Sequence, residues 1–238
     1  MEVLPRPTPR WFRDGFLRYN HRLLGRQLAA VRVAGLDRLP VHERAPVVVY
    51  LNHPAWWDPL ICAAIAGARA RHRRHIALID ARNLSGVLAR LGFVGIEPGT
   101  VAGARRLARL GDAIAESPET MLWMTPQGRF ADPRERPLAL AGGLARLARR
   151  MPHALFVPLA LEYPFLGARR AEARALVGTP IRAAEADESS LEAALERSMS
   201  RLAEHVVAGE LAPFETLVGR ASEVAGDGSA RAVADAPS

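Results

Sequence analysis

Residues 47–51 read VVVYL, an uninterrupted apolar run with three β-branched side chains. A run of this kind predicts a strand that is buried on both faces, as in a sheet covered by helices on each side. Other short apolar segments alternate with segments of helical periodicity along most of the chain. This alternation predicts an α/β fold, with a single domain in which a central mixed sheet is flanked by helices.

The remaining elements follow from the spacing of apolar side chains. Strands are expected at 31–35, 47–51, 75–80, 93–97, 120–125, 154–161 and 172–178, the last of them at an edge of the sheet. Helices are expected at 59–70, 84–91, 101–116, 138–150 and 189–209. With 238 residues, the chain is long enough for one such domain and too short for two large ones.

The N-terminal segment, residues 1–30, has the pattern of an amphipathic helix. Aromatic and aliphatic side chains, beginning at Trp11 and Phe16, recur at near-helical spacing, and arginines lie between them. This pattern is typical of a helix on a membrane surface, and equally of a helix packed on its own domain. The expected organisation is this helix, a folded domain at 31–218, and a small, polar, aperiodic tail at 219–238 that is expected to be disordered.

Composition limits the location and the partners of the chain. Its net charge is +7, and it contains arginine but no lysine. A basic surface attracts anionic lipid, phosphorylated ligands or nucleic acid, but no nucleic-acid-binding module is recognisable, so a nucleic-acid partner is not expected. The absence of a long apolar run and of a signal-peptide pattern predicts a cytoplasmic chain without a transmembrane helix. Cys62 is the single cysteine, which excludes an intramolecular disulfide and a multi-cysteine metal site.

A candidate catalytic pair follows the apolar run at 47–51. His53 stands where this strand ends, and Pro54 and Pro59 bracket a short segment that can bring Asp58 back toward the imidazole. Ligands of open α/β folds bind at such strand ends, and an Asp bonded to Nδ1 leaves Nε2 free as a general base. A polar turn without catalytic function fits the same spacing, which two other histidines of the chain share.

A second candidate site lies between the strand expected at 120–125 and the helix expected at 138–150. There the chain reads Pro-Gln127-Gly128-Arg129, followed by a basic loop. A glycine-containing loop with arginines ahead of a helix can bind phosphate. A solvated basic loop fits the same pattern.

The motifs, taken in order over roughly residues 30–180, resemble those of the glycerolipid (1-acylglycerol-3-phosphate-type) acyltransferases. NHPAWWD at 52–58 is similar to the first motif of that family, Asn-His-x4-Asp, and VPLAL at 157–161 matches its apolar fourth motif. The basic segment, the second motif and the Pro-Glu-Gly-Thr-Arg third motif correspond to Arg82-Asn83-Leu84, LGFVGIEPGT at 91–100 and TPQGRF at 125–130.

The resemblance implies an acyltransferase for acyl groups other than amino-acyl groups. It would move a fatty acyl group from acyl-CoA or acyl carrier protein to a lysophospholipid such as 1-acylglycerol-3-phosphate, in phospholipid biosynthesis. His53 would act as general base and Asp58 would orient it, without a metal, another cofactor or a covalent nucleophile. Substrate binding is expected at Asn52, Trp57, Arg82, Gln127, Gly128 and Arg129.

The same resemblance makes 31–218 the acyltransferase domain and implies a lipid acceptor. A lipid-using enzyme without a transmembrane helix needs another route to the bilayer. The basic, aromatic segment 1–30 predicts peripheral association with an anionic membrane surface, at the cytoplasmic face of the cell membrane.

Two departures from the family concern the acceptor. The second motif lacks the family's arginine, since Glu97-Pro98-Gly99 stands in its place. In the third motif Gln127 replaces Glu, and Arg129 comes one position early. Two alternatives therefore stay open: an acyltransferase for a non-glycerophosphate acceptor, such as a glycolipid, an ornithine lipid or a carotenoid glycoside, and a non-catalytic lipid-binding protein of the same fold.

Overall fold

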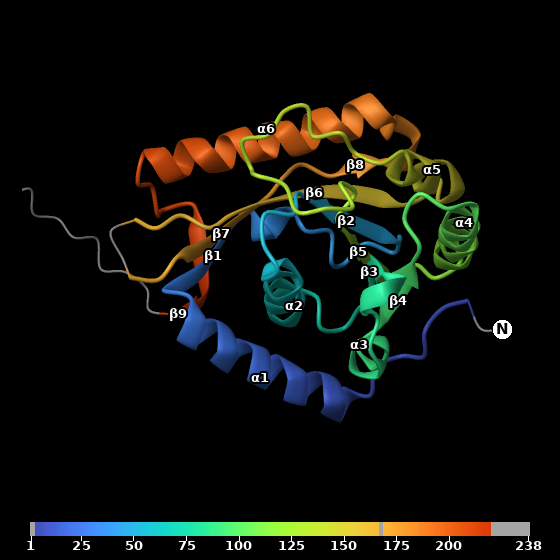
Figure 1. Cartoon of the computed structure of the whole chain (residues 1–238), viewed down its shortest axis with the longest axis horizontal. Coiled ribbons are helices and arrows are strands. Elements are labelled where there is room, and N and C mark those ends of the chain that lie inside the picture. The colour runs from blue at the N-terminus through green and yellow to red at the C-terminus, as the bar shows by residue number, and fades with distance from the viewer. Residues whose placement is uncertain (1–2, 167–168, 220–238) are drawn as a thin grey trace, which may run out of the picture.

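A mixed sheet of nine strands forms the centre of the computed structural model, which describes residues 3–166 and 169–219 (Figure 1). The order along the sheet is β4-β3-β5-β2-β6-β7-β1-β9, and the short β8 pairs with β6. The strands are β1 (Ala30–Ala34), β2 (Val47–Leu51), β3 (Arg74–Asp80), β4 (Phe93–Ile96), β5 (Thr120–Met124), β6 (Leu155–Glu162), β7 (Glu172–Val177), β8 (Ile181–Arg182) and β9 (Phe214–Gly219). The predicted α/β fold with a mixed central sheet is confirmed.

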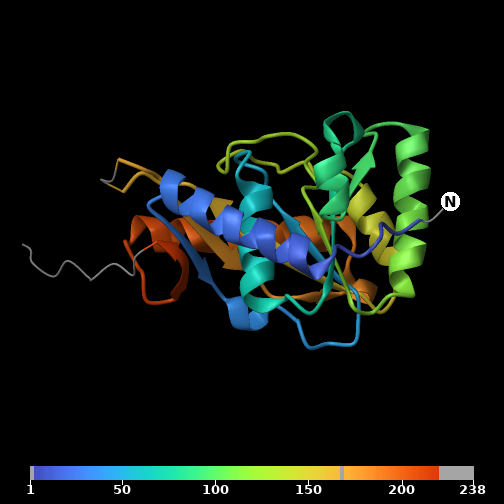
Figure 2. The same ribbon diagram turned by 90° about the horizontal axis from the view of Figure 1, so that it is seen from below.

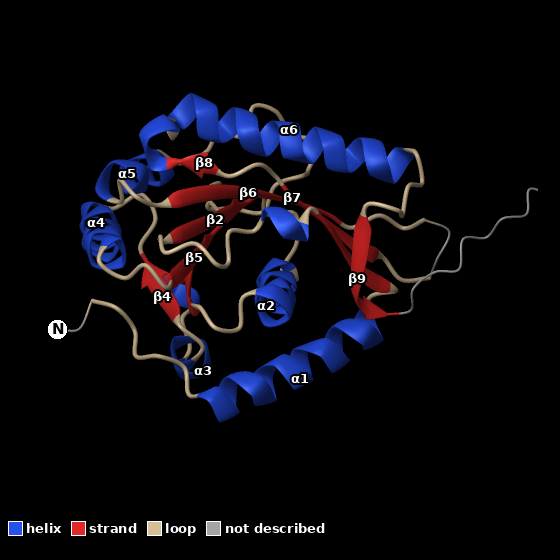
Figure 3. Cartoon of the chain, turned by 180° about the vertical axis from the view of Figure 1, so that it is seen from behind, coloured by secondary structure: helices blue, strands red, loops and turns tan. Residues whose placement is uncertain are grey.

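Helices cover both faces of the sheet, with α4, α5 and α6 on one side and α1 and α2 on the other (Figures 1 and 3). The α-helices of the described residues are α1 (Arg10–Gln27), α2 (Asp58–Arg69), α3 (Gly86–Arg90), α4 (Val101–Ala115), α5 (Gly143–Arg150) and α6 (Glu188–Val207). Short 3-10 helices are η1 (Leu36–Arg38), η2 (Ala81–Asn83) and η3 (Ala183–Glu185).

The strand β2 is buried on both faces, as its composition predicts. Val48 and Tyr50 pack into the core beneath α4, α5 and α6. Val47, Val49 and Leu51 pack into the core on the side of α1 and α2. A strand of this composition has no polar face for water, so it occupies the interior of the sheet.

The five strands β4, β3, β5, β2 and β6 are parallel neighbours. Their carboxyl ends therefore meet at one edge of the sheet, which we call the carboxyl edge. His53 follows β2 at this edge, Gln127 follows β5, and Tyr163 follows β6. The sheet thus brings together residues that lie far apart in the sequence.

The strand expected at 172–178 does not lie at the edge of the sheet. β7 lies between β6 and β1, and the edge is β9, which pairs antiparallel with β1 and was not predicted. The interior position is possible because the charge of Arg174 in β7 is satisfied within the sheet, by Glu172 at 3.1 Å. Gly219, the first residue of the expected tail, ends β9, and the rest of that tail lies outside the described residues.

The helix expected at 138–150 begins at Gly143 instead, because the residues ahead of it form a loop. Leu138 and Leu140 are buried in the core without being helical. Their apolar side chains extended the apparent helical pattern toward the N-terminus, although they belong to the loop that crosses the carboxyl edge.

The N-terminal helix α1 is packed on its own domain and lies across α2 (Figure 2). Leu24 is buried, and the buried Asn20 donates a hydrogen bond from Nδ2 to the Leu60 carbonyl oxygen at 2.8 Å. The outer side of α1 exposes Trp11 and Tyr19, which are 73% and 61% accessible. Packing on the domain and an exposed aromatic surface therefore coexist on one helix.

Candidate active site

His53 and Asp58 form a hydrogen-bonded pair at the carboxyl edge. Between them the chain leaves β2, turns, and enters α2, whose first residue is Asp58. His53 Nδ1 lies 2.6 Å from Asp58 Oδ2. Because a carboxylate only accepts hydrogen bonds, the proton of the neutral imidazole belongs on Nδ1, and Nε2 makes no hydrogen bond to any described residue. The ring is thus arranged as a general base requires.

The Asp58 carboxylate is fully buried and receives three hydrogen bonds. Oδ2 accepts from His53 and from the Ala55 backbone N–H at 3.3 Å, and Oδ1 accepts from the Tyr163 hydroxyl at 2.7 Å. Burial raises the pKa of Asp58 above its ordinary value, and the hydrogen bonds from His53 and Tyr163 offset this only in part. The first turn of α2 also favours a negative charge at this position.

The backbone of His53 is held by the loop that follows β5. His53 N–H donates to Gln127 Oε1 at 3.2 Å, and Ala131 N–H donates to the His53 carbonyl oxygen at 3.0 Å. The Phe130 ring lies against the imidazole, with 4.3 Å between the ring centroids. The imidazole is therefore fixed by Asp58 at one nitrogen and covered by Phe130, and its side chain keeps 18% of its accessible surface.

Gln127 uses both ends of its amide within the protein. Oε1 accepts from His53, and Nε2 donates to the Leu138 carbonyl oxygen at 3.3 Å. A glutamate, which the third motif of the resembled family carries here, could accept from His53 but could not donate to Leu138 while ionised. The Gln in place of Glu therefore suits the loop conformation of this chain.

Asn52 ties the first and fourth motifs together. It is buried, its Nδ2 donates to the Leu161 carbonyl oxygen at 2.9 Å, and its Oδ1 accepts from Leu161 N–H at 2.8 Å. These bonds continue the β2–β6 pairing beyond the end of β2. They place His53 in a fixed position relative to β6, while substrate contact by Asn52 stays a prediction.

The other predicted binding residues also lie at the carboxyl edge, and three of them contact other side chains of the protein. The half-buried Trp57 stacks on Trp56, with 3.8 Å between ring centroids, and Gly128 adopts a positive φ of 66° in the turn after β5. The charged members are paired: Arg82 with Asp80 at 2.6 Å, and Arg129 with Glu135. Their contact with substrate stays a prediction.

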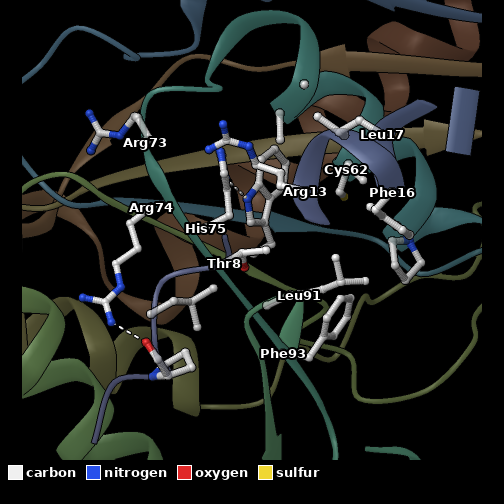
Figure 4. A pocket seen from close by; sticks show the side chains of 18 of the residues that line it. Thr8, Arg13, Phe16, Leu17, Cys62, Arg73, Arg74, His75, Leu91 and Phe93 are labelled. Atoms are coloured by element: carbon white, nitrogen blue, oxygen red, sulfur yellow. Dashed lines mark hydrogen bonds between the residues drawn. The ribbon is translucent and has the colours of Figure 1, made fainter. Parts of the chain in front are cut away.

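A cavity of about 960 Å³ extends from Asp58 along α2 and β3 toward the N-terminal segment (Figure 4). Phe16 and Leu17 of α1 and Leu91 and Phe93 near α3 give it apolar walls. Its far end is basic, and Arg74 there donates a hydrogen bond to the Pro5 carbonyl oxygen. The cavity is thus mainly apolar and reaches Asp58, the first residue of α2.

Tyr163 and Phe130 were not singled out from the sequence. Tyr163 follows the apolar strand β6, and His53 follows β2 after one intervening residue. This position at the end of an apolar strand is the sequence feature that could have pointed to Tyr163. In the part of the chain that the structure describes, no three His, Cys, Asp or Glu side chains gather into a set that could hold a metal ion.

The fold and this site together define an α/β protein with a hydrogen-bonded histidine–aspartate pair at the carboxyl edge and an adjoining apolar cavity. The family model described as Acyltransferase matches residues 30–162, more than half of the chain, and the chain belongs to this family. The resemblance inferred from the motifs is confirmed at the level of family and of enzyme class.

A solved structure supports the same fold. The crystal structure of the 1-acyl-sn-glycerophosphate (LPA) acyltransferase PlsC from Thermotoga maritima is similar to this chain with a TM-score of 0.58 and 15% sequence identity. The match covers 82% of this chain and 80% of that one. No curated protein sequence matches the chain significantly.

The dual hydrogen bonding of Gln127 predicts the effect of restoring the family's residue. We expect Gln127→Glu to lower the free energy of unfolding by about 1–3 kcal/mol at neutral pH, because the Leu138 carbonyl oxygen loses its donor and faces a carboxylate. The difference in free energy of unfolding between wild type and variant should shrink as the pH falls toward the ordinary Glu pKa of about 4.3, because a protonated Glu can donate a hydrogen bond.

Urea unfolding at several pH values measures this effect. The matched control is Gln27→Glu, at the exposed end of α1, for which we expect a change of no more than about 1 kcal/mol. Equal stability of the two variants at neutral pH would contradict the assigned role of Gln127.

Proposed function

We propose that this acyltransferase moves a fatty acyl group from acyl-CoA or acyl carrier protein to a hydroxyl of a lysophospholipid such as 1-acylglycerol-3-phosphate, in phospholipid biosynthesis. The observation that carries the proposal is the 2.6 Å contact between His53 Nδ1 and the buried Asp58, with Nε2 left for a substrate proton. The adjoining apolar cavity supports a lipid substrate.

In the proposed reaction, Nε2 of His53 takes the proton of the acceptor hydroxyl while the hydroxyl oxygen attacks the thioester carbonyl carbon. The carbon–sulfur bond then breaks, and the imidazolium returns the proton to the leaving thiolate. Asp58 holds the ring in the required tautomer and stabilises its positive charge. Cys62 is a poor nucleophile in this setting, since burial and the charge of Asp58 raise the pKa of its thiol.

The acyl chain is proposed to occupy the cavity, with its thioester end near His53. The α2 side of the cavity is lined by small residues, which leaves room for a chain: Cys62, Ala63, Ala66 and Gly67. Phe16 and Leu17 of α1 also line the cavity, and the Leu17 side chain packs closely against Gly67. Burial of methylene groups contributes about 0.8 kcal/mol each, so a cavity of this kind favours long acyl chains over short ones.

The acceptor head group would bind at the carboxyl edge, beside the predicted binding residues. A phosphate would be expected near Arg82, Gly128 and Arg129, but both arginines already pair with acidic side chains. That pairing, with the missing arginine at 97–99, favours the second candidate, an acyltransferase whose acceptor is a glycolipid, an ornithine lipid or a carotenoid glycoside. The third alternative, a non-catalytic lipid-binding protein, is at odds with the enzyme family to which residues 30–162 belong.

Peripheral association with an anionic membrane surface, at the cytoplasmic face of the cell membrane, is also proposed. None of the helices in the described residues is long and apolar enough to cross a bilayer. The outer side of α1 presents Trp11 and Tyr19 together with exposed Arg18 and Arg22. Exposed aromatics among arginines support attachment through apolar insertion and attraction to anionic lipid.

The catalytic assignment predicts that His53→Ala and Asp58→Asn each lower acyl transfer by about 10²–10⁴-fold while the fold is kept. Asp58→Asn should not reduce thermal stability strongly, because it removes a buried charge. The assay uses radiolabelled acyl-CoA and a panel of lysophosphatidic acid, other lysophospholipids, glycolipid, ornithine-lipid and carotenoid-glycoside acceptors. Full activity of either folded variant would refute the mechanism, and the preferred acceptor distinguishes the candidate enzymes.

The cavity assignment predicts a change in acyl-chain selectivity. We expect Ala63→Leu to lower kcat/KM for long-chain acyl-CoA about tenfold or more relative to short-chain acyl-CoA, because the added side chain fills the cavity. Ala68→Leu is the matched control, since Ala68 lies on the same helix, is exposed and does not line the cavity. An unchanged selectivity ratio in Ala63→Leu would place the acyl chain elsewhere.

The membrane proposal predicts that Trp11→Ala combined with Tyr19→Ala reduces sedimentation with phosphatidylglycerol vesicles while leaving the melting temperature unchanged. Both side chains are exposed, so their removal should not disturb the packing of α1. Val207→Ala, at an exposed apolar position on α6, is the control and should bind as the wild type does. Wild-type binding by the double variant would rule out this surface.

A further inference from the structure

We propose that Tyr163 is a positioning residue that acts on His53 through Asp58, a role that rests on the proposed function. The Tyr163 hydroxyl donates a hydrogen bond of 2.7 Å to Asp58 Oδ1, the carboxylate oxygen that does not face His53. The three residues thus form a chain, Tyr163–Asp58–His53, that ends at the nitrogen assigned to the substrate proton.

The topology of the sheet explains how Tyr163 reaches Asp58. β6 runs parallel to β2 and is paired with it from Val47 to Leu51, so both strands end at the carboxyl edge. Asn52 fixes the two ends to each other through Leu161, and Tyr163 lies two residues beyond Leu161. Tyr163 is therefore held by the same pairing that holds His53.

Asp58 depends on this hydroxyl because its carboxylate is fully buried. Oδ2 has two donors, His53 and Ala55, whereas Tyr163 is the single donor to Oδ1 among the described residues. Without the hydroxyl, Oδ1 would be a buried acceptor with no hydrogen bond, which is costly and leaves the carboxylate free to rotate or to bind a proton. The hydroxyl thus fixes both the orientation and the charge of Asp58.

The Tyr163 hydroxyl acts as a donor throughout and does not exchange its proton with substrate. Burial, followed by the charge of Asp58, raises the pKa of this phenol well above its ordinary value. The other titratable groups around the carboxylate are His53, from the turn after β2, and Cys62, one turn along α2. Neither supplies a second donor to Oδ1.

Removing the hydroxyl should change the pH profile in a defined direction. A carboxylate that has lost a donor is more basic, so the His53–Asp58 pair binds its proton more tightly. The acid limb of the profile, which reports the pair, should move to higher pH. Loss of side-chain packing alone would lower activity or stability without this shift.

The chain offers a matched control in Tyr50. Its hydroxyl is also buried and donates a hydrogen bond of 3.1 Å, to the Leu191 carbonyl oxygen of α6. Tyr50 lies on β2, three residues before His53, but its side chain packs into the core on the opposite face of the sheet. Tyr50→Phe therefore removes a comparable hydrogen bond without touching the Asp58 carboxylate.

The experiment measures acyl transfer from palmitoyl-CoA between pH 5 and 9 for wild type, Tyr163→Phe, Tyr50→Phe and His53→Ala. We expect Tyr163→Phe to lower kcat about tenfold with KM for palmitoyl-CoA unchanged, and to move the acid limb to higher pH. Tyr50→Phe should change neither. A Tyr163→Phe profile equal to that of wild type, with His53→Ala inactive, would overturn the role of Tyr163 alone, whereas an active His53→Ala would overturn the proposed function itself.

Two further measurements test the proposal, and the first of them does not require Tyr163→Phe to fold. Incorporation of 3-fluorotyrosine into a Tyr19→Phe, Tyr50→Phe background places a stronger donor at position 163 only, and should move the acid limb to lower pH. In a double-mutant cycle, Tyr163→Phe should have little further effect on kcat in the Asp58→Asn background, because the residue acts through that carboxylate. An unmoved limb with fluorotyrosine, or full additivity in the cycle, would contradict the proposal.

Discussion

A buried carboxylate is the constraint around which the carboxyl edge is built. Taking Asp58 out of water is unfavourable unless its oxygens are hydrogen-bonded and its charge is offset. His53, Ala55 and Tyr163 supply those bonds, and the N-terminus of α2 supplies a favourable partial charge. The histidine is consequently one of the groups that make the buried charge tolerable, so its orientation and the stability of the carboxylate are linked.

Parallel neighbouring strands make this arrangement possible. β2, β5 and β6 each end at the carboxyl edge, and the segments that follow them bring His53, Gln127 and Tyr163 together there. Gln127 is separated from His53 by 74 positions, and Tyr163 from Asp58 by 105. In a parallel sheet such residues meet without any special loop geometry, because the register of the strands fixes where they end.

This separation also explains what could be predicted from the sequence. The burial of VVVYL and the His53–Asp58 pair depend on a few neighbouring residues, and both were predictable from local pattern. The hydrogen bonds of Tyr163 and Gln127 join distant segments, so no spacing in the sequence encodes them. The edge strand β9 was missed for the same reason, since its place is set by pairing with β1, far earlier in the chain.

The two sides of the N-terminal helix α1 have different surroundings. Its inner side buries Leu24 against the domain and lines the cavity with Phe16 and Leu17, while its outer side exposes Trp11 and Tyr19. An apolar chain in the cavity would therefore be separated from the surroundings by little more than the thickness of α1 and the segment before it. Under the proposed function, the helix that would contact the membrane is also a wall of the acyl site, so its docking on α2 would link membrane contact to the space that holds the acyl chain.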